Sequence, residues 1–272
     1  MKNELLFAII DLGDNMKIQE IKKLKSGKYK IKIDDKVITT YDDVILKNKL
    51  LYQKEIDYDS YHQIGIDSIY YDAYHKALNY ILRKLRSTLE VKKYLEGLEV
   101  NEEDAKQIIN KLRSGGFIND KNYVKAYISD NFYLSNDGPS KIQNYLLSQE
   151  IDENVIEEEI SKLDSREVHE KLKKLIFKKL KNDKNKSTYQ LKRKVLVDMV
   201  NIGYSKDMIL EILDNCDIED DEKLEKEYNK LYNKYINKIE DNDLYKKIKE
   251  KLYSKGFDIN DIQSFMKKKT EE

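Results

Sequence analysis

The sequence has little of several residue types on which other protein classes depend. It contains one cysteine, one proline and no tryptophan among 272 residues. A lone Cys216 cannot form an intramolecular disulfide, and because it falls on the apolar face of its helix pattern we expect a buried structural thiol. The scarcity of proline, with abundant Lys, Glu, Leu and Ile, favours helix throughout.

Long apolar runs are also missing. No stretch of about 18 apolar residues, the length that a membrane-spanning helix needs, is present. The N-terminal apolar segment Leu5–Ile10 is too short, and too soon followed by acids, for a signal peptide. The sequence therefore predicts a soluble, cytoplasmic protein with no membrane contact.

The chain carries no net charge, because Lys plus Arg and Asp plus Glu number 51 each. Net charge thus says nothing about partners, but charge density does, since 38% of the residues are charged. So many charges disfavour one large globular core. They fit an elongated helical array with a thin core and a large surface.

Residue sets that carry catalysis or bind metals are absent as well. His62, His75 and His169 are scattered and share no ligand spacing with Cys216 or with an acidic pair. There is no phosphate-binding glycine loop, nucleophile elbow or zinc-binding cysteine set. We therefore expect a binding protein rather than an enzyme, with no metal and no cofactor.

What the sequence does contain is a repeated pattern. An apolar anchor is followed five positions later by a second apolar residue and then by a helix-capping residue, and the four caps are 51, 53 and 53 residues apart. Further apolar residues stand four positions before each anchor and four positions after each cap. A fixed period of this size is typical of stacked helical repeats. The anchors are Leu95, Leu146, Met199 and Leu252; the caps are Asn101, Asp152, Ser205 and Asp258; the residues before the anchors are Val91, Ile142, Val195 and Ile248; those after the caps are Ala105, Ile156, Ile209 and Ile262.

The pattern before the repeats differs. Tyr29–Ile33 alternates apolar and basic residues, and β-branched residues follow after a turn, so a small antiparallel sheet is predicted over about residues 16–41. Short helices are predicted at about 42–49 and 57–65, and Ser68 is expected to open a long helix. The apolar face of that helix is predicted to comprise Ile69, Ala73, Ala77, Tyr80 or Ile81, and Leu85.

The fold class predicted is all-α, with three-helix repeats in an elongated curved array and a small N-terminal β region. Helices are expected at about 87–95, 101–112, 139–148, 152–163, 165–182, 188–202, 205–215, 222–239, 242–255 and 258–269, with Asp120 capping a further helix. The predicted domains are 1–66 for the sheet and short helices, then four helical repeats at 67–131, 132–164, 165–217 and 218–272.

One stretch has a strong local charge. From Arg166 to Lys194 twelve Lys and Arg, including Lys184 and Lys186, stand against three acids, and an acidic block at 214–227 follows. A solvated helix face is the plain interpretation, but the density favours a polyanion or a charged protein groove as partner. Tyrosines at 123, 127, 133, 145 and 189 could stack on bases, although their positions on apolar faces favour the core.

Several motifs, in order, resemble the RecX family of regulatory proteins. The match is clearest over about residues 70–163, and Tyr41–Leu51 with the preceding hairpin resembles an extension of the low-GC Gram-positive branch. Two positions depart from the family pattern, with Asn131 in place of an arginine and Glu150 in place of a glycine. The motifs are Ala77-Leu78 through Arg83, Ser87 with Glu90-Val91 and Leu95, Gly116–Asp120 with Tyr123 and Tyr127-Ile128, and Gly138–Ile142 with Leu146 and Ile151.

The resemblance implies a modulator of the RecA recombinase, acting in DNA repair, homologous recombination and the SOS response. Such proteins bind the groove of the RecA–single-stranded DNA filament and generally restrain ATP hydrolysis and strand exchange. We expect a monomeric inhibitor without chemistry of its own; a RecA-independent protein that binds single-stranded or duplex DNA, or a helical scaffold, are the alternatives. The expected contact residues are Arg83, Lys84, Arg86, Lys111, Arg113, Lys171, Lys173, Lys174, Lys178, Lys179, Lys181, Lys192, Arg193 and Lys194.

Overall fold

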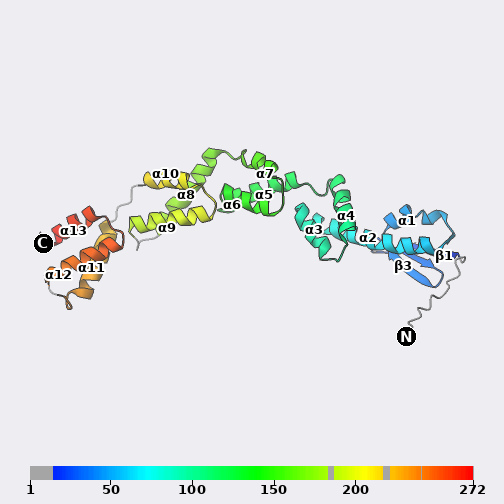
Figure 1. The fold of residues 1–272 in the computed structure, drawn as a ribbon, viewed down its shortest axis with the longest axis horizontal. Coiled ribbons are helices and arrows are strands. Elements are labelled where there is room, and N and C mark those ends of the chain that lie inside the picture. Colours follow the sequence, from blue (N-terminus) through cyan, green and yellow to red (C-terminus); the bar gives the residue numbers. More distant parts are fainter. Residues whose placement is uncertain (1–14, 183–186, 217–220, 240, 272) are drawn as a thin grey trace, which may run out of the picture. The chain divides into compact units, whose positions relative to one another are not determined.

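A computed structural model of the chain describes residues 15–182, 187–216, 221–239 and 241–271. It is mostly helical, with a small antiparallel sheet near its N-terminal end, and this confirms the predicted fold class (Figure 1). The chain divides into two compact units, residues 1–123 and 124–272. The elongated, curved arrangement and the repeat boundaries stay predictions.

The predicted sheet is present, and a short strand at Glu55–Ile56, outside the predicted range of 16–41, adds to it. Strands β1 (Met16–Lys23), β2 (Tyr29–Ile33), β3 (Lys36–Thr40) and β4 (Glu55–Ile56) lie in the order β3-β2-β1-β4. In the central register Ile31 pairs with Ile21 on one side and with Ile38 on the other. Ile31 and Ile33 are fully buried against α1 and α2, which cover the apolar face as so small a sheet requires.

Helix α1 (Asp42–Lys47) is followed by the 3₁₀ turn η1 (Leu50–Tyr52) and then by the long helix α2 (Tyr58–Arg83). The predicted break between residues 65 and 68 is wrong, because α2 runs through it and the Ser68 hydroxyl donates to the Ile64 carbonyl at 2.7 Å. Two residues of the predicted apolar face, Ile69 and Leu85, are exposed. The buried face instead includes Ile64, Ala73, Ala77 and Ile81.

Helices α3 (Thr88–Glu96) and α4 (Glu102–Ser114) pack with α2 around one core. Ser87 and Glu90 form a full capping box at the start of α3, and Asn101 caps α4 as predicted. Asp120 does not cap α5 (Asp120–Leu134), because the Asn119 side chain accepts from the Asn122 N–H at 3.0 Å. The Asp120 carboxylate accepts instead from the Thr88 N–H and hydroxyl, at 2.9 and 2.6 Å, and ties α5 to the start of α3.

The remaining helices begin and end within a few residues of the predicted bounds. Pro139 occupies the first turn of its helix, where its missing N–H costs nothing. These remaining helices are α6 (Pro139–Ser148), α7 (Glu153–Ile160), α8 (Ser165–Asn182), α9 (Thr188–Asn201), α10 (Lys206–Asp214), α11 (Asp221–Tyr235), α12 (Asp241–Ser254) and α13 (Ile259–Glu271) (Figure 1).

The repeated apolar positions form the cores of the helical repeats. All four anchors, all four residues before them and all four residues after the caps are buried, with at most 5% of any of them exposed. The residue that follows each anchor by four positions has a positive φ: Glu99 at 60°, Glu150 at 57°, Gly203 at 91° and Gly256 at 82°. At three of these turns the next N–H, that of Val100, Tyr204 or Phe257, donates to the anchor carbonyl, which closes a Schellman turn.

Within the second unit, the helix start of one repeat contacts the turn of the next. The Gly138 N–H donates to the Ile202 carbonyl at 2.6 Å, and the Ser140 N–H donates to Gly203 O at 3.1 Å. Fifty-three residues further on, the carbonyl of Lys255 accepts from the Ser187 hydroxyl at 2.7 Å. Backbone contacts of this kind leave no room for a side chain at Gly203, and they join the repeats of this unit at fixed positions.

Candidate functional site

The basic stretch lies on α8 and α9, in the second unit. Helix α8 buries Val168, Leu172, Ile176 and Leu180, which are spaced four residues apart and form one stripe. Other positions of the helix therefore point to solvent. The exposed residues Lys173, Lys174, Phe177, Lys178 and Lys181, which we call the α8 basic face, follow helical spacing along one side.

The α8 basic face combines free cations with an exposed ring. In the part of the chain that the structure describes, none of its four lysines forms an ion pair with a carboxylate. Phe177 is 46% exposed in the midst of them, although an apolar side chain gains by burial. A cationic helix face with an exposed aromatic ring can hold a strand of phosphates and stack on a base.

Two other lysines of α8 are engaged inside the protein. The Lys171 ammonium donates to the Phe132 carbonyl and lies 4.4 Å from the centre of the Phe132 ring. Burial lowers the pKa of Lys171. Lys179 forms an ion pair with Asp198 of α9. Both side chains therefore join α8 to its neighbours, and a partner would have to displace these contacts.

On α9, Arg193 and Lys194 are exposed and Lys192 is half-buried. Arg193 and Lys194 line a groove of about 1280 Å³ in the second unit. Lys184 and Lys186, part of the same run in the sequence, lie outside the described residues.

In the first unit too, some of the predicted cations are exposed to solvent and others contact side chains of the protein itself. Arg83 and Lys84 are exposed beside the exposed Leu82 and Leu85, at the end of α2. Arg86, in contrast, pairs with Glu90 at 2.9 Å and lies 4.1 Å from the centre of the Tyr80 ring.

Lys111 and Arg113 are also engaged internally. The Lys111 ammonium lies 4.4 Å from the ring centres of both Tyr71 and Tyr74, and 3.7 Å from Asp43. Arg113 donates to the Thr88 hydroxyl at 3.2 Å. Of the predicted contact residues, those left exposed without a described ion pair or side-chain hydrogen bond are Arg83, Lys84, Lys173, Lys174, Lys178, Lys181, Arg193 and Lys194.

The predicted tyrosines divide between core and surface. Tyr123 is buried, and the rings of Tyr127 and Tyr145 stack on each other at 4.3 Å. Tyr133, Tyr145 and Tyr189 are exposed, and the Tyr133 hydroxyl donates to Glu167 at 3.0 Å. Among the five, Tyr189 is thus the exposed one that borders the groove.

The sequence spacing missed a group of side chains with the types and spacing able to hold a metal ion: Asp42, Asp43 and His75, whose oxygen and nitrogen atoms lie within 4.8 Å of one another. His75 contacts Asp43 at 2.7 Å and stacks on Tyr41 at 3.7 Å. With the Lys111 ammonium beside Asp43, these contacts join α1 to α2 and α4. His75 follows Asp43 by 32 residues, so only the packing of α2 on α1 brings the histidine to the two acids.

Sequence reasoning also missed Phe177, Val197 and Tyr253, three exposed apolar residues near the predicted cations. The signal was present for Phe177, which falls on the lysine side of α8 rather than in the apolar stripe. Cys216 is buried as predicted, and its thiol donates to the Ile212 carbonyl at 3.1 Å. No helix of the described residues has the length and hydropathy needed to span a membrane.

Comparisons with known proteins find similarity to the family that the sequence motifs resemble. Residues 73–112 match the family model described as RecX, first three-helix domain, and residues 219–266 match RecX, third three-helix domain. The chain is 30% identical over 267 residues to Regulatory protein RecX of Bacillus cereus, covering 93% of this chain and 97% of that protein. It is 28% identical to Regulatory protein RecX of Bacillus subtilis, covering 90% and 94%.

Solved structures are similar as well. A crystal structure of regulatory protein RecX matches with a TM-score of 0.65 and 25% identity, over 73% of this chain and 99% of that one. A crystal structure of RecX from Lactobacillus salivarius matches with a TM-score of 0.50 and 30% identity, over 54% and 96%.

Proposed function

The chain belongs to the RecX family of regulatory proteins, and we propose on that premise that it is a non-enzymatic regulator of the RecA recombinase. It binds the groove of the RecA–single-stranded DNA filament as a monomer and limits ATP hydrolysis and strand exchange.

The α8 basic face is the observation that carries this proposal. Its four lysines are exposed and have no described acidic partner, so their charges are available to phosphates or to acidic side chains of a filament. Arg193 and Lys194 on α9, in the same unit, are further proposed contacts, as are Arg83 and Lys84 at the end of α2 in the first unit.

The test is the ATPase activity of RecA on single-stranded DNA, with this protein added at substoichiometric amounts. The wild-type chain is expected to lower the rate. A variant with Lys173, Lys174, Lys178 and Lys181 all replaced by Glu is expected to need at least about tenfold more protein for the same effect, because it loses phosphate contacts and the release of their counterions. Lys179 is left unchanged, because Glu at that position would face Asp198.

The matched control replaces Lys230, Lys238, Lys246 and Lys247 by Glu, which changes the net charge equally on exposed positions of α11, α12 and the turn between them. This control is expected to inhibit like the wild type. Equal loss in both variants would assign the effect to net charge alone. Absence of any effect of the wild type on the ATPase and on preformed filaments would refute the proposed function.

RecA-independent DNA binding is the second candidate, favoured by Phe177 in the middle of the lysines. Binding to bare single-stranded DNA through phosphates weakens with salt, with a slope of about −0.7 in log K against log salt for each contact. Binding of bare DNA at physiological salt with the affinity seen for the filament would favour this candidate. If the chain binds neither DNA nor RecA, the remaining hypothesis is that it is a helical scaffold for another partner.

A further inference from the structure

The groove on α9 is built where two repeats meet. The start of α9 forms one part of it, and the turn between α12 and α13 forms another. Ser187 bonds the Lys255 carbonyl across this junction, and the Tyr189 ring lies against Gly256 so closely that a Cβ there would be 2.9 Å from it. The groove is therefore a preformed feature of the packing, and a ligand need not first order its walls.

Apolar side chains remain exposed along this groove. Tyr189 and Tyr253 are each 63% exposed, and Val197 is 53% exposed. Exposed tyrosines next to an arginine are the composition typical of the energetically dominant residues of protein interfaces. Arg193 and Lys194 lie on the same helix as Tyr189 and Val197, and no described carboxylate pairs with them.

The acids of the groove select the class of ligand. Four aspartates line the groove. Asp221 lies in the first turn of α11, Asp261 lies in the first turn of α13, and Asp258 directly precedes α13. The fourth is Asp198 of α9. The Asp258 carboxylate accepts from the Asn260 N–H at 2.7 Å. A nucleic-acid strand would bring its phosphates beside these carboxylates, so the charge pattern opposes it. A protein segment places one carboxylate on Arg193 rather than a charge at every unit of its backbone, so it meets less of this repulsion, and its apolar side chains meet none.

We propose that this groove binds a segment of a partner protein that seats an apolar side chain against Tyr189, Val197 and Tyr253 and presents a carboxylate to Arg193. The inference rests on the proposed function, which makes the partner a RecA protomer. The chain then contacts its target at two surfaces: the α8 basic face meets phosphates or acidic patches of the filament, and the groove meets protein.

Binding of groove variants to preformed RecA–single-stranded DNA filaments tests this inference. Tyr253→Ala and Arg193→Glu are each expected to weaken binding at least about tenfold, as for a central interface residue. Arg193→Lys is expected to retain most of the affinity. The matched controls are Tyr52→Ala and Lys206→Glu, two exposed residues outside the groove, and unchanged thermal unfolding shows that each variant is folded.

A photo-reactive phenylalanine analogue at position 253 identifies the ligand directly. A cross-link to RecA in filaments supports the inference. A cross-link to the DNA alone, or groove variants that bind filaments like the wild type, overturns it while the proposed function stands. Failure of the wild-type chain itself to bind filaments overturns the proposed function and this inference together.

Discussion

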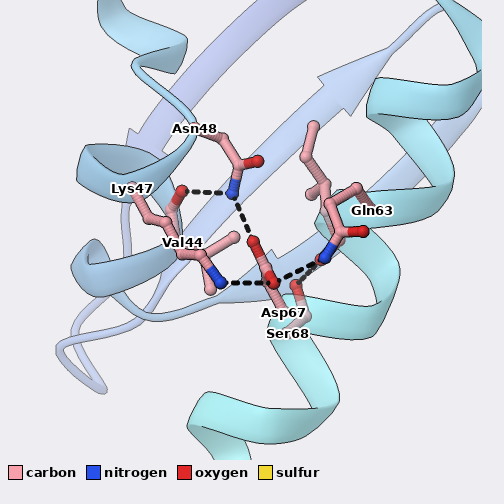
Figure 2. Close-up of polar contacts among 7 residues, drawn as sticks. Val44, Lys47, Asn48, Gln63, Asp67 and Ser68 are labelled. Carbon is pink, nitrogen blue, oxygen red and sulfur yellow. Dashed lines mark hydrogen bonds and ion pairs between the residues drawn. The ribbon is translucent and has the colours of Figure 1, made fainter.

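At the scale of single residues, the Asp67 carboxylate joins α1 to α2. It is buried, and it accepts hydrogen bonds from Lys47 at 2.9 Å, Asn48 at 2.8 Å and Gln63 at 2.9 Å (Figure 2). Burial of the carboxyl opposes its ionisation, but the hydrogen bonds from Asn48, Lys47 and Gln63 outweigh it and hold the pKa of Asp67 below its ordinary value of 3.8.

We expect Asp67→Asn to lower the free energy of unfolding by about 2 kcal/mol near neutral pH, because the new amide places a donor against other donors. The folded pKa is depressed, so the contribution of the carboxylate is complete above the unfolded pKa of 3.8 and is lost as pH falls through the folded value. Urea unfolding of both proteins across acidic pH should show their difference shrinking below that range. Asp59→Asn, at an exposed position of α2, is the control, and a difference independent of pH would contradict the assignment.

At the scale of elements, the turn after each anchor has a position of positive φ that is occupied by glutamate in some repeats and by glycine in others. The backbone needs a positive φ in all four repeats, which side chains other than glycine adopt at a cost of about 1–2 kcal/mol. Glutamate stands there in the first two repeats and glycine in the last two. The difference has a packing reason for Gly203, because a Cβ there would lie 2.4 Å from the Lys141 backbone nitrogen.

This predicts opposite effects of two substitutions. Gly203→Ala should destabilise the protein by more than about 2 kcal/mol, since it adds a clash with backbone to the cost of a positive φ. Glu150→Gly should be neutral or stabilising by up to about 1 kcal/mol, since it removes that cost at a turn whose φ is 57°. Denaturant unfolding measures both. If alanine at Gly203 leaves the stability unchanged, the backbone at the junction between the second and third repeats must be able to move apart to make room for the Cβ.

Features set by local sequence were predicted well. Caps such as Asn101 and Ser205 and the buried anchors fixed most helix bounds, because capping and apolar period act over a few residues. The predicted break at Gly65 was wrong, because packing of Ile64 and Asp67 on α1 offsets the cost of a glycine within a helix, about 1 kcal/mol.

The candidate site was less predictable, because it too depends on packing between residues far apart in the sequence. Which lysines are free depends on partners far along the chain, as for Lys171 with Phe132, 39 residues away, and no periodicity reveals such pairs. Charge density located the region, but only the packing separates Lys173 and Lys178 from Lys171 and Lys179.

At the scale of the whole molecule, the period of the sequence predicts an array in which each repeat is coupled to its neighbours alone. The hydrogen bonds of Gly138, Ser140 and Ser187 fit this, since each joins one helix start to the turn of the next repeat. Damage to the last repeat should therefore weaken that repeat and the start of α9, and leave the first unit intact.

Leu252→Ala tests this coupling. Leu252 is fully buried in the core of α11–α13, and its truncation should cost about 2–5 kcal/mol in that repeat. Amide hydrogen exchange is expected to speed up in α11, α12 and α13 and around Ser187, whose hydroxyl binds the Lys255 carbonyl. Exchange in α2, α3 and α4 should be unchanged. Uniform acceleration across those helices would mean that the chain unfolds as one cooperative body, and that the repeats stabilise one another over more than a neighbour's distance.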